Sequence, residues 1–118
     1  MLIKKLFNSV KRYSLTLDLK DDAALIAEYE AWHQKVWPEI LASIKESGIE
    51  NMEIYRFANR LFMIMEVNNN FSFEAKAAAD EANATVQEWE TLMWNFQQPV
   101  AHAKPGEKWV LMDKIFQL

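Results

Sequence analysis

The sequence predicts an α+β fold of the ferredoxin-like type, with its elements in the order β-α-β-β-α-β. Residues 12–20 alternate between polar and apolar side chains, which is typical of a half-buried strand. Two apolar runs, 51–57 and 60–67, flank the short turn formed by Ala58 and Asn59, and this pattern predicts a hairpin. Apolar side chains at helical spacing follow the first strand and again follow the hairpin.

The first helical region is predicted in two pieces. Asp21 or Asp22 can cap a helix that runs to about Lys35, because an aspartate side chain accepts hydrogen bonds from the first free amides. Pro38 cannot continue that helix, since it lacks an amide hydrogen and disfavours helical geometry in the preceding residue. A second helical piece is therefore predicted at 38–46.

The second half of the chain supplies the remaining elements of the predicted β-α-β-β-α-β order. Residues 60–67 are apolar at nearly every position, so we expect both faces of this strand to be covered. A helical pattern then extends from about 71 to 96, with an interruption near Asn83. The C-terminal residues 108–118 are predicted to form a last strand, again apolar on both faces.

Composition is that of a globular protein: 118 residues, of which 51% are hydrophobic and 25% charged. We expect one domain at 10–118, preceded by a short leader at 1–9. The net charge of −4 argues against nucleic acid as a partner, because phosphate binding needs a basic surface. No apolar run reaches the ~18 residues of a membrane span. The absence of cysteine excludes disulfides and fits a cytoplasmic location.

One face of the predicted sheet has no helix to cover it. Its apolar candidates, or their alternates, are Phe62, Ile64, Met112 and Phe116. A contiguous apolar patch of this kind is rarely left in water, so the simplest cover is a second copy of the chain. We therefore expect a homodimer of the dimeric α/β barrel type, formed by sheet-on-sheet contact. Cover by the leader or by the 97–108 loop is the alternative.

Tyr29 and His33 are the polar residues of an otherwise apolar helix stripe. They project about 40° apart on a helix, so both face inward. One interpretation is a core tyrosine and histidine, each bonded to a backbone group. The other is a neutral imidazole suited to proton transfer, beside a phenol that orients substrate. Spacing alone does not decide between them.

A second candidate pair lies on the last helix. Trp89 belongs to its apolar stripe, and Glu90 lies on the flank of that stripe. Trp89 is either a core residue or a platform for the apolar face of a sugar ring, whose hydroxyls Glu90 could bind. His33 and His102 are far apart in sequence and have no carboxylate pair at ligand spacing, so we expect no metal site.

The order of these segments resembles that of the L-rhamnose mutarotase family. The matching features are a first strand followed by EYEAWHQKVWPEI, the segment NMEIYRFANRLFMIMEV, the helix QEWETLMW and a strand near the C-terminus. They cover nearly everything from Val10 on, and the Y-x-x-x-H plus W-P-E-I block is the most specific part. The resemblance implies a dimeric isomerase that interconverts the α and β anomers of a 6-deoxy-L-sugar by acid/base ring opening and closure, without a cofactor.

The resemblance also assigns roles by position. The family's catalytic histidine matches His33, and its substrate-binding tyrosine matches Tyr29. Its tryptophan pair falls on Trp89 and Glu90, so that only the first tryptophan is kept. A further sugar-contacting tyrosine falls on Met52. Tyr55 is the nearest remaining aromatic residue.

Glu90 and Met52 thus depart from the family pattern. These departures leave the expected reaction intact but affect which sugar we expect as the substrate. L-Rhamnose is the first candidate that the resemblance implies, and L-fucose is the second. The fold also allows a cofactor-independent monooxygenase or a lactone isomerase, since such barrels combine an inward histidine with tryptophan and tyrosine. A sugar-binding module without catalysis is the other alternative.

Overall fold

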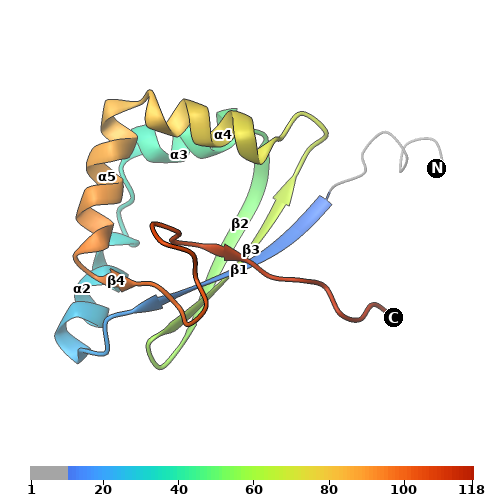
Figure 1. Cartoon of the computed structure of the whole chain (residues 1–118). Helices are drawn as coiled ribbons and strands as arrows, with labels where there is room; N and C mark the ends of the chain where they lie inside the picture. The colour runs from blue at the N-terminus through green and yellow to red at the C-terminus, as the bar shows by residue number, and fades with distance from the viewer. Residues whose placement is uncertain (1–10) are drawn as a thin grey trace.

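The computed structural model describes residues 11–118, and the leader expected at 1–9 lies outside these residues. The described part contains four helices and five strands. They follow the chain as β1 (Lys11–Leu19), α2 (Ala23–Trp32), α3 (Pro38–Glu46), β2 (Ile49–Phe57), β3 (Arg60–Val67), α4 (Phe73–Glu81), α5 (Ala84–Trp94), β4 (Gln97–Gln98) and β5 (Val110–Leu111). The helices lie to one side of a single sheet (Figure 1).

The sheet has the strand order β2-β3-β1-β4, and β5 also pairs with β1. All of these pairings are antiparallel. The order confirms the ferredoxin-like α+β prediction, in which the first and third strands of the repeat lie in the middle of the sheet. The β1–β3 register, from Lys11 opposite Val67 to Asp18 opposite Arg60, determines which side chains share a face.

The first helix begins as predicted but ends earlier. The Asp22 carboxylate accepts a hydrogen bond from the Leu25 amide at 3.0 Å and so caps the N-terminus of α2. The helix was expected to reach Lys35, but it ends at Trp32, and His33 is its C-cap. The chain must turn before Pro38, which occupies the first turn of α3, and this turn takes up the missing residues.

The predicted interruption near Asn83 is confirmed. The Asn83 side chain accepts hydrogen bonds from the amides of Thr85 and Val86, so it ends one helix and caps the next. The break lets α5 turn away from α4 and run towards β4 (Figure 1). Trp89 and its neighbours on α5 are thereby directed onto the core.

The last strand was predicted too long. Only Val110 and Leu111 pair with β1, and the Met112 amide then donates to the carbonyl of Ser14. Gln97 and Gln98 pair with the far end of β1, so residues 99–109 form a loop within what would be one edge strand. Beyond residue 112 the chain leaves the sheet as an exposed segment (Figure 1).

The two faces of the sheet differ in burial. Side chains of β3 alternate between buried ones on the inner face, such as Leu61 and Met63, and half-buried ones on the outer face, such as Phe62 and Ile64. The expectation that both faces of this strand are covered is therefore wrong for a single chain. The inner face and the helices enclose two packed clusters, which Trp109 joins.

Candidate active site

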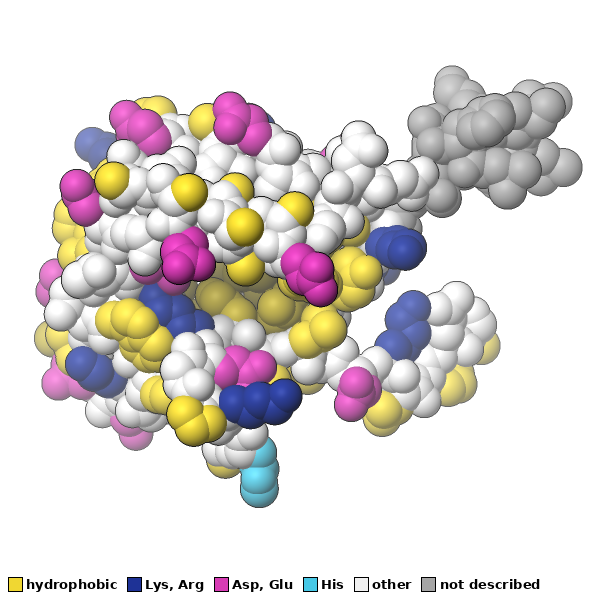
Figure 2. All heavy atoms as spheres, turned by 45° about the horizontal axis from the view of Figure 1, so that its top comes forward, with side chains coloured by type: hydrophobic (Ala, Val, Ile, Leu, Met, Phe, Trp, Pro, Cys, Tyr) yellow, Lys and Arg dark blue, Asp and Glu magenta, His cyan; other side chains and the backbone are white. Residues whose placement is uncertain are grey.

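A cavity of about 880 Å³ lies between the inner face of the sheet and the helices. Figure 2 shows a hollow with hydrophobic side chains on its floor and acidic and basic ones around its rim. The volume is within the range of small-molecule sites, which reach ~1,000 Å³. Apolar side chains of β3, α3 and α5 form much of the lining. The polar lining residues that matter for chemistry are Tyr29, His33, Glu90, Gln97 and Lys108.

His33 has one ring nitrogen committed to the backbone. Its Nδ1 lies 2.9 Å from the carbonyl oxygen of Tyr29. Because a carbonyl can only accept a hydrogen bond, Nδ1 carries the proton in the neutral ring, and Nε2 keeps its lone pair. Burial lowers the pKa of His33 below its ordinary value of 6.5, and the backbone bond opposes this only in part. The ring is therefore a neutral base at physiological pH.

The Tyr29 phenol lies directly beside this imidazole. The two ring centroids are 4.3 Å apart, and Tyr29 is 4% exposed. Burial raises the pKa of Tyr29 to about 12, with a smaller contribution from the charge of Glu90, while hydrogen bonding by the Gln97 side chain opposes the rise. Tyr29 thus keeps its proton across the physiological range and can donate a hydrogen bond into the cavity.

Trp89 packs against three aromatic neighbours. Its ring makes edge contacts with Trp37 at 5.1 Å, with His33 at 5.8 Å and with Trp32 at 6.4 Å between centroids. It is 7% exposed, belongs to the core cluster and also lines the cavity. The core and the binding interpretations of Trp89 are therefore compatible, because a fixed indole can both pack and present an apolar surface.

Glu90 is paired with a residue that the sequence analysis did not single out. Lys108 Nζ donates to the Glu90 carboxylate at 2.7 Å and to its backbone carbonyl at 3.0 Å. The same ammonium lies 4.6 Å from the centroid of the Trp94 ring. Lys108 comes from the end of the 99–109 loop, 18 residues further along the chain, so no local pattern could have indicated the contact.

Of the two remaining residues predicted for the site, one lines the cavity and the other does not. Met52 lines the cavity from β2. Tyr55 is not brought to the cavity, because residues three apart on a strand face opposite sides. It lies on the outer face, 53% exposed, with its ring 6.5 Å from that of Phe62.

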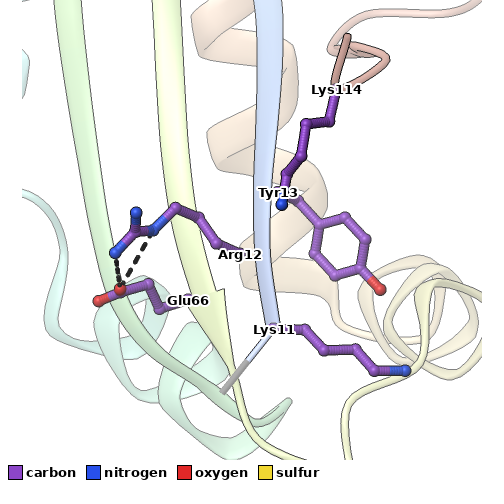
Figure 3. Close-up of a pocket in the computed structure, with 5 residues that line it drawn as sticks. All are labelled: Lys11, Arg12, Tyr13, Glu66 and Lys114. Atoms are coloured by element: carbon purple, nitrogen blue, oxygen red, sulfur yellow. Dashed lines mark hydrogen bonds and ion pairs between the residues drawn. The ribbon is translucent and has the colours of Figure 1, made fainter. Parts of the chain in front are cut away.

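A second, shallower hollow of about 470 Å³ lies at the start of β1. Figure 3 shows Arg12 and Glu66 joined on one side of the strand, with Tyr13 and Lys114 on the other. The Arg12 pair lowers the pKa of Glu66, which is an exposed ion-pair effect. No neutral base lies among its five lining residues, so we place the candidate active site in the larger cavity.

Residues 11–118 contain no group of three histidine or acidic side chains placed to hold a metal ion. None of their helices has both the length and the apolarity needed to cross a membrane.

Comparison with known proteins gives consistent matches. A family model described as L-rhamnose mutarotase matches residues 12–118. An L-fucose mutarotase of Xanthomonas campestris pv. campestris is 47% identical over 112 residues, covering 93% of this chain and 90% of the relative. An L-rhamnose mutarotase of Oceanobacillus iheyensis is 31% identical over 88 residues, covering 73% of this chain and 77% of the relative.

The fold has a solved counterpart. A crystal structure of an L-rhamnose mutarotase from Formosa agariphila superposes with a TM-score of 0.67 over 92% of this chain and 98% of that one. The sequence identity of that pair is 18%, so this likeness concerns the fold.

Proposed function

The chain belongs to the L-rhamnose mutarotase family and interconverts sugar anomers, and we propose that its substrate is a 6-deoxy-L-sugar on which His33 performs the proton transfers. One observation carries the proposal. The hydrogen bond from His33 Nδ1 to the Tyr29 carbonyl leaves Nε2 as a neutral base in a cavity large enough for a sugar. The family assignment does not favour the monooxygenase or lactone isomerase alternative.

Mutarotation begins with loss of the proton from the anomeric hydroxyl. Nε2 of His33 takes this proton, the C1–O5 bond breaks as C1 becomes an aldehyde, and O5 receives a proton. Both oxygens are bonded to C1 in the ring form, so a single imidazole can carry the proton from one to the other. Rotation about C1–C2 then presents the other face of the aldehyde to O5, and the same steps in reverse close the ring.

Tyr29 acts in this scheme as a hydrogen-bond donor that keeps its proton. A phenol with a pKa of about 12, buried near Glu90, is a poor source of a free proton. Its hydroxyl can still stabilise the negative charge that develops on the sugar oxygens, because a donor in a water-poor cavity is strongly effective. His33 and Tyr29 therefore have separate roles, as proton carrier and as donor.

Substrate recognition rests on the fixed indole and the ion pair beside it. Trp89 offers an apolar face to the C–H side of the sugar, and Glu90 offers carboxylate oxygens to its hydroxyls. Met52 contributes apolar surface to the lining of the cavity. We place L-fucose ahead of L-rhamnose, the reverse of the order expected from the sequence, because the fucose-named relative is 47% identical and the rhamnose-named one 31%.

A homodimer is part of the proposal. Phe62 and Ile64 are half-buried on the outer face of the sheet, with Tyr55 and Phe57 exposed beside them. The segment after β5 adds exposed Phe116. Apolar surface of this extent on the uncovered side of a sheet is best removed from water by a second sheet. A cytoplasmic location stays a prediction from the sequence.

The test is anomer exchange measured by NMR, in which one anomeric proton is saturated and transfer to the other is followed. L-Fucose, L-rhamnose and D-glucose are compared at equal concentration with and without protein. We expect enhanced transfer for the 6-deoxy-L-sugars, stronger with L-fucose, and none for D-glucose. Binding of a sugar without enhanced exchange would support the non-catalytic module instead.

A further inference from the structure

Gln97 of β4 has a buried polar atom without a partner. The residue is 5% exposed, and its side-chain Oε1 finds no hydrogen-bond donor among the described residues. Gln97 also belongs to the lining of the cavity. Leaving a buried amide oxygen unpaired is unfavourable, so native proteins rarely keep one without a reason.

The backbone explains why this side chain reaches the cavity. Gln97 is paired with Leu19 of β1, and paired residues lie on the same face of a sheet. Leu19 is fully buried on the inner face, under the helices. Gln98, the next residue, is half-buried and does not line the cavity, as the alternation of a strand requires.

The Gln97 side chain also lies close to Tyr29. Its polar group counters the effect of burial on the pKa of the Tyr29 phenol. Both residues line the same cavity, and Oε1 of Gln97 has no hydrogen-bond partner there among the described residues.

We propose that Gln97 is a substrate-binding residue whose Oε1 accepts a hydrogen bond from one ring hydroxyl of the sugar. The proposal rests on the function proposed above. A hydroxyl is the matching chemistry, because Oε1 is a neutral acceptor and the cavity beside it is lined largely by apolar groups. L-Fucose and L-rhamnose differ in configuration at C2 and C4, so one of these hydroxyls is the natural candidate.

The test couples a protein change to a substrate change. Gln97→Met keeps the length of the side chain and removes the acceptor, and Gln98→Met in the same strand is the matched control. Each variant and the wild type are assayed for anomer exchange with L-fucose and with its 2-, 3- and 4-deoxy analogues. For one deoxy analogue we expect kcat/KM to be roughly tenfold lower than for L-fucose with the wild type. With Gln97→Met the same difference should be less than about threefold.

Two further measurements separate binding from structure. Because Gln97→Met removes an unpaired buried acceptor, its melting temperature should not fall, whereas a purely structural glutamine would give a less stable variant. Gln97→Glu retains acceptor oxygens and should keep the discrimination between L-fucose and the critical analogue. Gln97→Leu, which also lacks the acceptor, serves if Gln97→Met does not fold.

The outcomes distinguish this proposal from the one on which it rests. One outcome overturns the role of Gln97 and leaves the proposed function intact. In that outcome the wild type catalyses exchange of L-fucose, and all three analogues lose activity equally in wild type, Gln97→Met and Gln97→Glu. Absence of exchange by the wild type with every sugar overturns the proposed function and this inference together. A loss confined to one hydroxyl, and removed by Gln97→Met, supports both.

Discussion

The Nδ1–H of His33 donates to the carbonyl of Tyr29 at 2.9 Å, across one turn of the chain where α2 ends. The bond fixes the tautomer of the imidazole and the position of its ring against the phenol. His33 is the C-cap of α2, and its backbone amide also donates to the Tyr29 carbonyl, at 3.3 Å. One carbonyl therefore holds both the end of the helix and the imidazole ring.

His33→Ala should fold and lose anomer exchange. General acid/base groups contribute about 10²–10⁴-fold, and we expect a fall in kcat of that size. His102→Ala is the matched control, because His102 is the other histidine and lies exposed in the 99–109 loop. Wild-type exchange rates in His33→Ala, measured by NMR saturation transfer, would contradict the assignment of the proton carrier.

The pH dependence of kcat/KM should have its acidic limb below pH 6.5. Burial lowers the pKa of His33, so the free enzyme holds the neutral base down to lower pH than an exposed histidine would. Because the folded-state pKa is below the unfolded one, this group also lowers stability as the pH falls through 6.5. Exchange rates and urea unfolding from pH 4.5 to 8 measure the two effects. An acidic limb above pH 6.5 would count against His33.

Tyr29 should give no alkaline limb in the assay range. Its pKa of about 12 means that the phenol keeps its proton up to pH 10. Since the folded pKa is raised, its contribution to stability is present below pH 10 and is lost as the pH rises towards 12. Wild type should therefore lose more stability than Tyr29→Phe between pH 10 and 11.5, as followed by urea unfolding. Parallel curves would show that Tyr29 is not buried as described.

Glu90→Trp should shift specificity towards L-rhamnose. The change introduces the second tryptophan that the resemblance to the family implies at this position, and it removes a carboxylate that can bind sugar hydroxyls. We expect the ratio of kcat/KM for L-fucose over L-rhamnose to fall by roughly fivefold or more. Glu90→Gln, which also breaks the ion pair with Lys108, is the control. An unchanged ratio in Glu90→Trp would exclude Glu90 from substrate selection.

Phe62→Asp should convert the proposed dimer into a monomer. The charge would be placed at the centre of the outer face, where desolvation opposes its burial against a second sheet. Ala79→Glu adds one charge on the exposed side of α4 and should leave the dimer intact. Light scattering after size exclusion gives the mass of each. A monomeric wild type would refute the dimer directly.

Gly48→Ala should destabilise the fold where α3 passes into β2. Gly48 has φ of +100°, and an added Cβ would lie 2.6 Å from Asn68 Oδ1 and 3.2 Å from the Phe71 amide nitrogen. We expect a loss of about 1–3 kcal/mol in the free energy of unfolding. Gly106→Ala is the control, since φ is +80° there and nothing lies within 4 Å of the added Cβ. Similar losses at both positions would show that the clash has no effect.

The sequence alone determined the strands β1 to β3, a helix cap at Asp21 or Asp22, the start of α3 and the break at Asn83. Each of these depends on local rules, namely alternation, capping and the missing amide hydrogen of proline. It also determined that Tyr29 and His33 face the same side, because their spacing is one helical turn. Relationships between residues that lie close together in the chain follow from these local rules.

Tertiary structure alone decided which distant residues complete the site. Lys108 meets Glu90, and Gln97 joins Tyr29 in the lining of the cavity, only because β4 and β5 share one edge of β1 around a loop. It also excluded Tyr55 from the cavity, since strand pleating assigns Met52 and Tyr55 to opposite faces. Contacts between residues many positions apart depend on register and chain path, and no local pattern of the sequence records these.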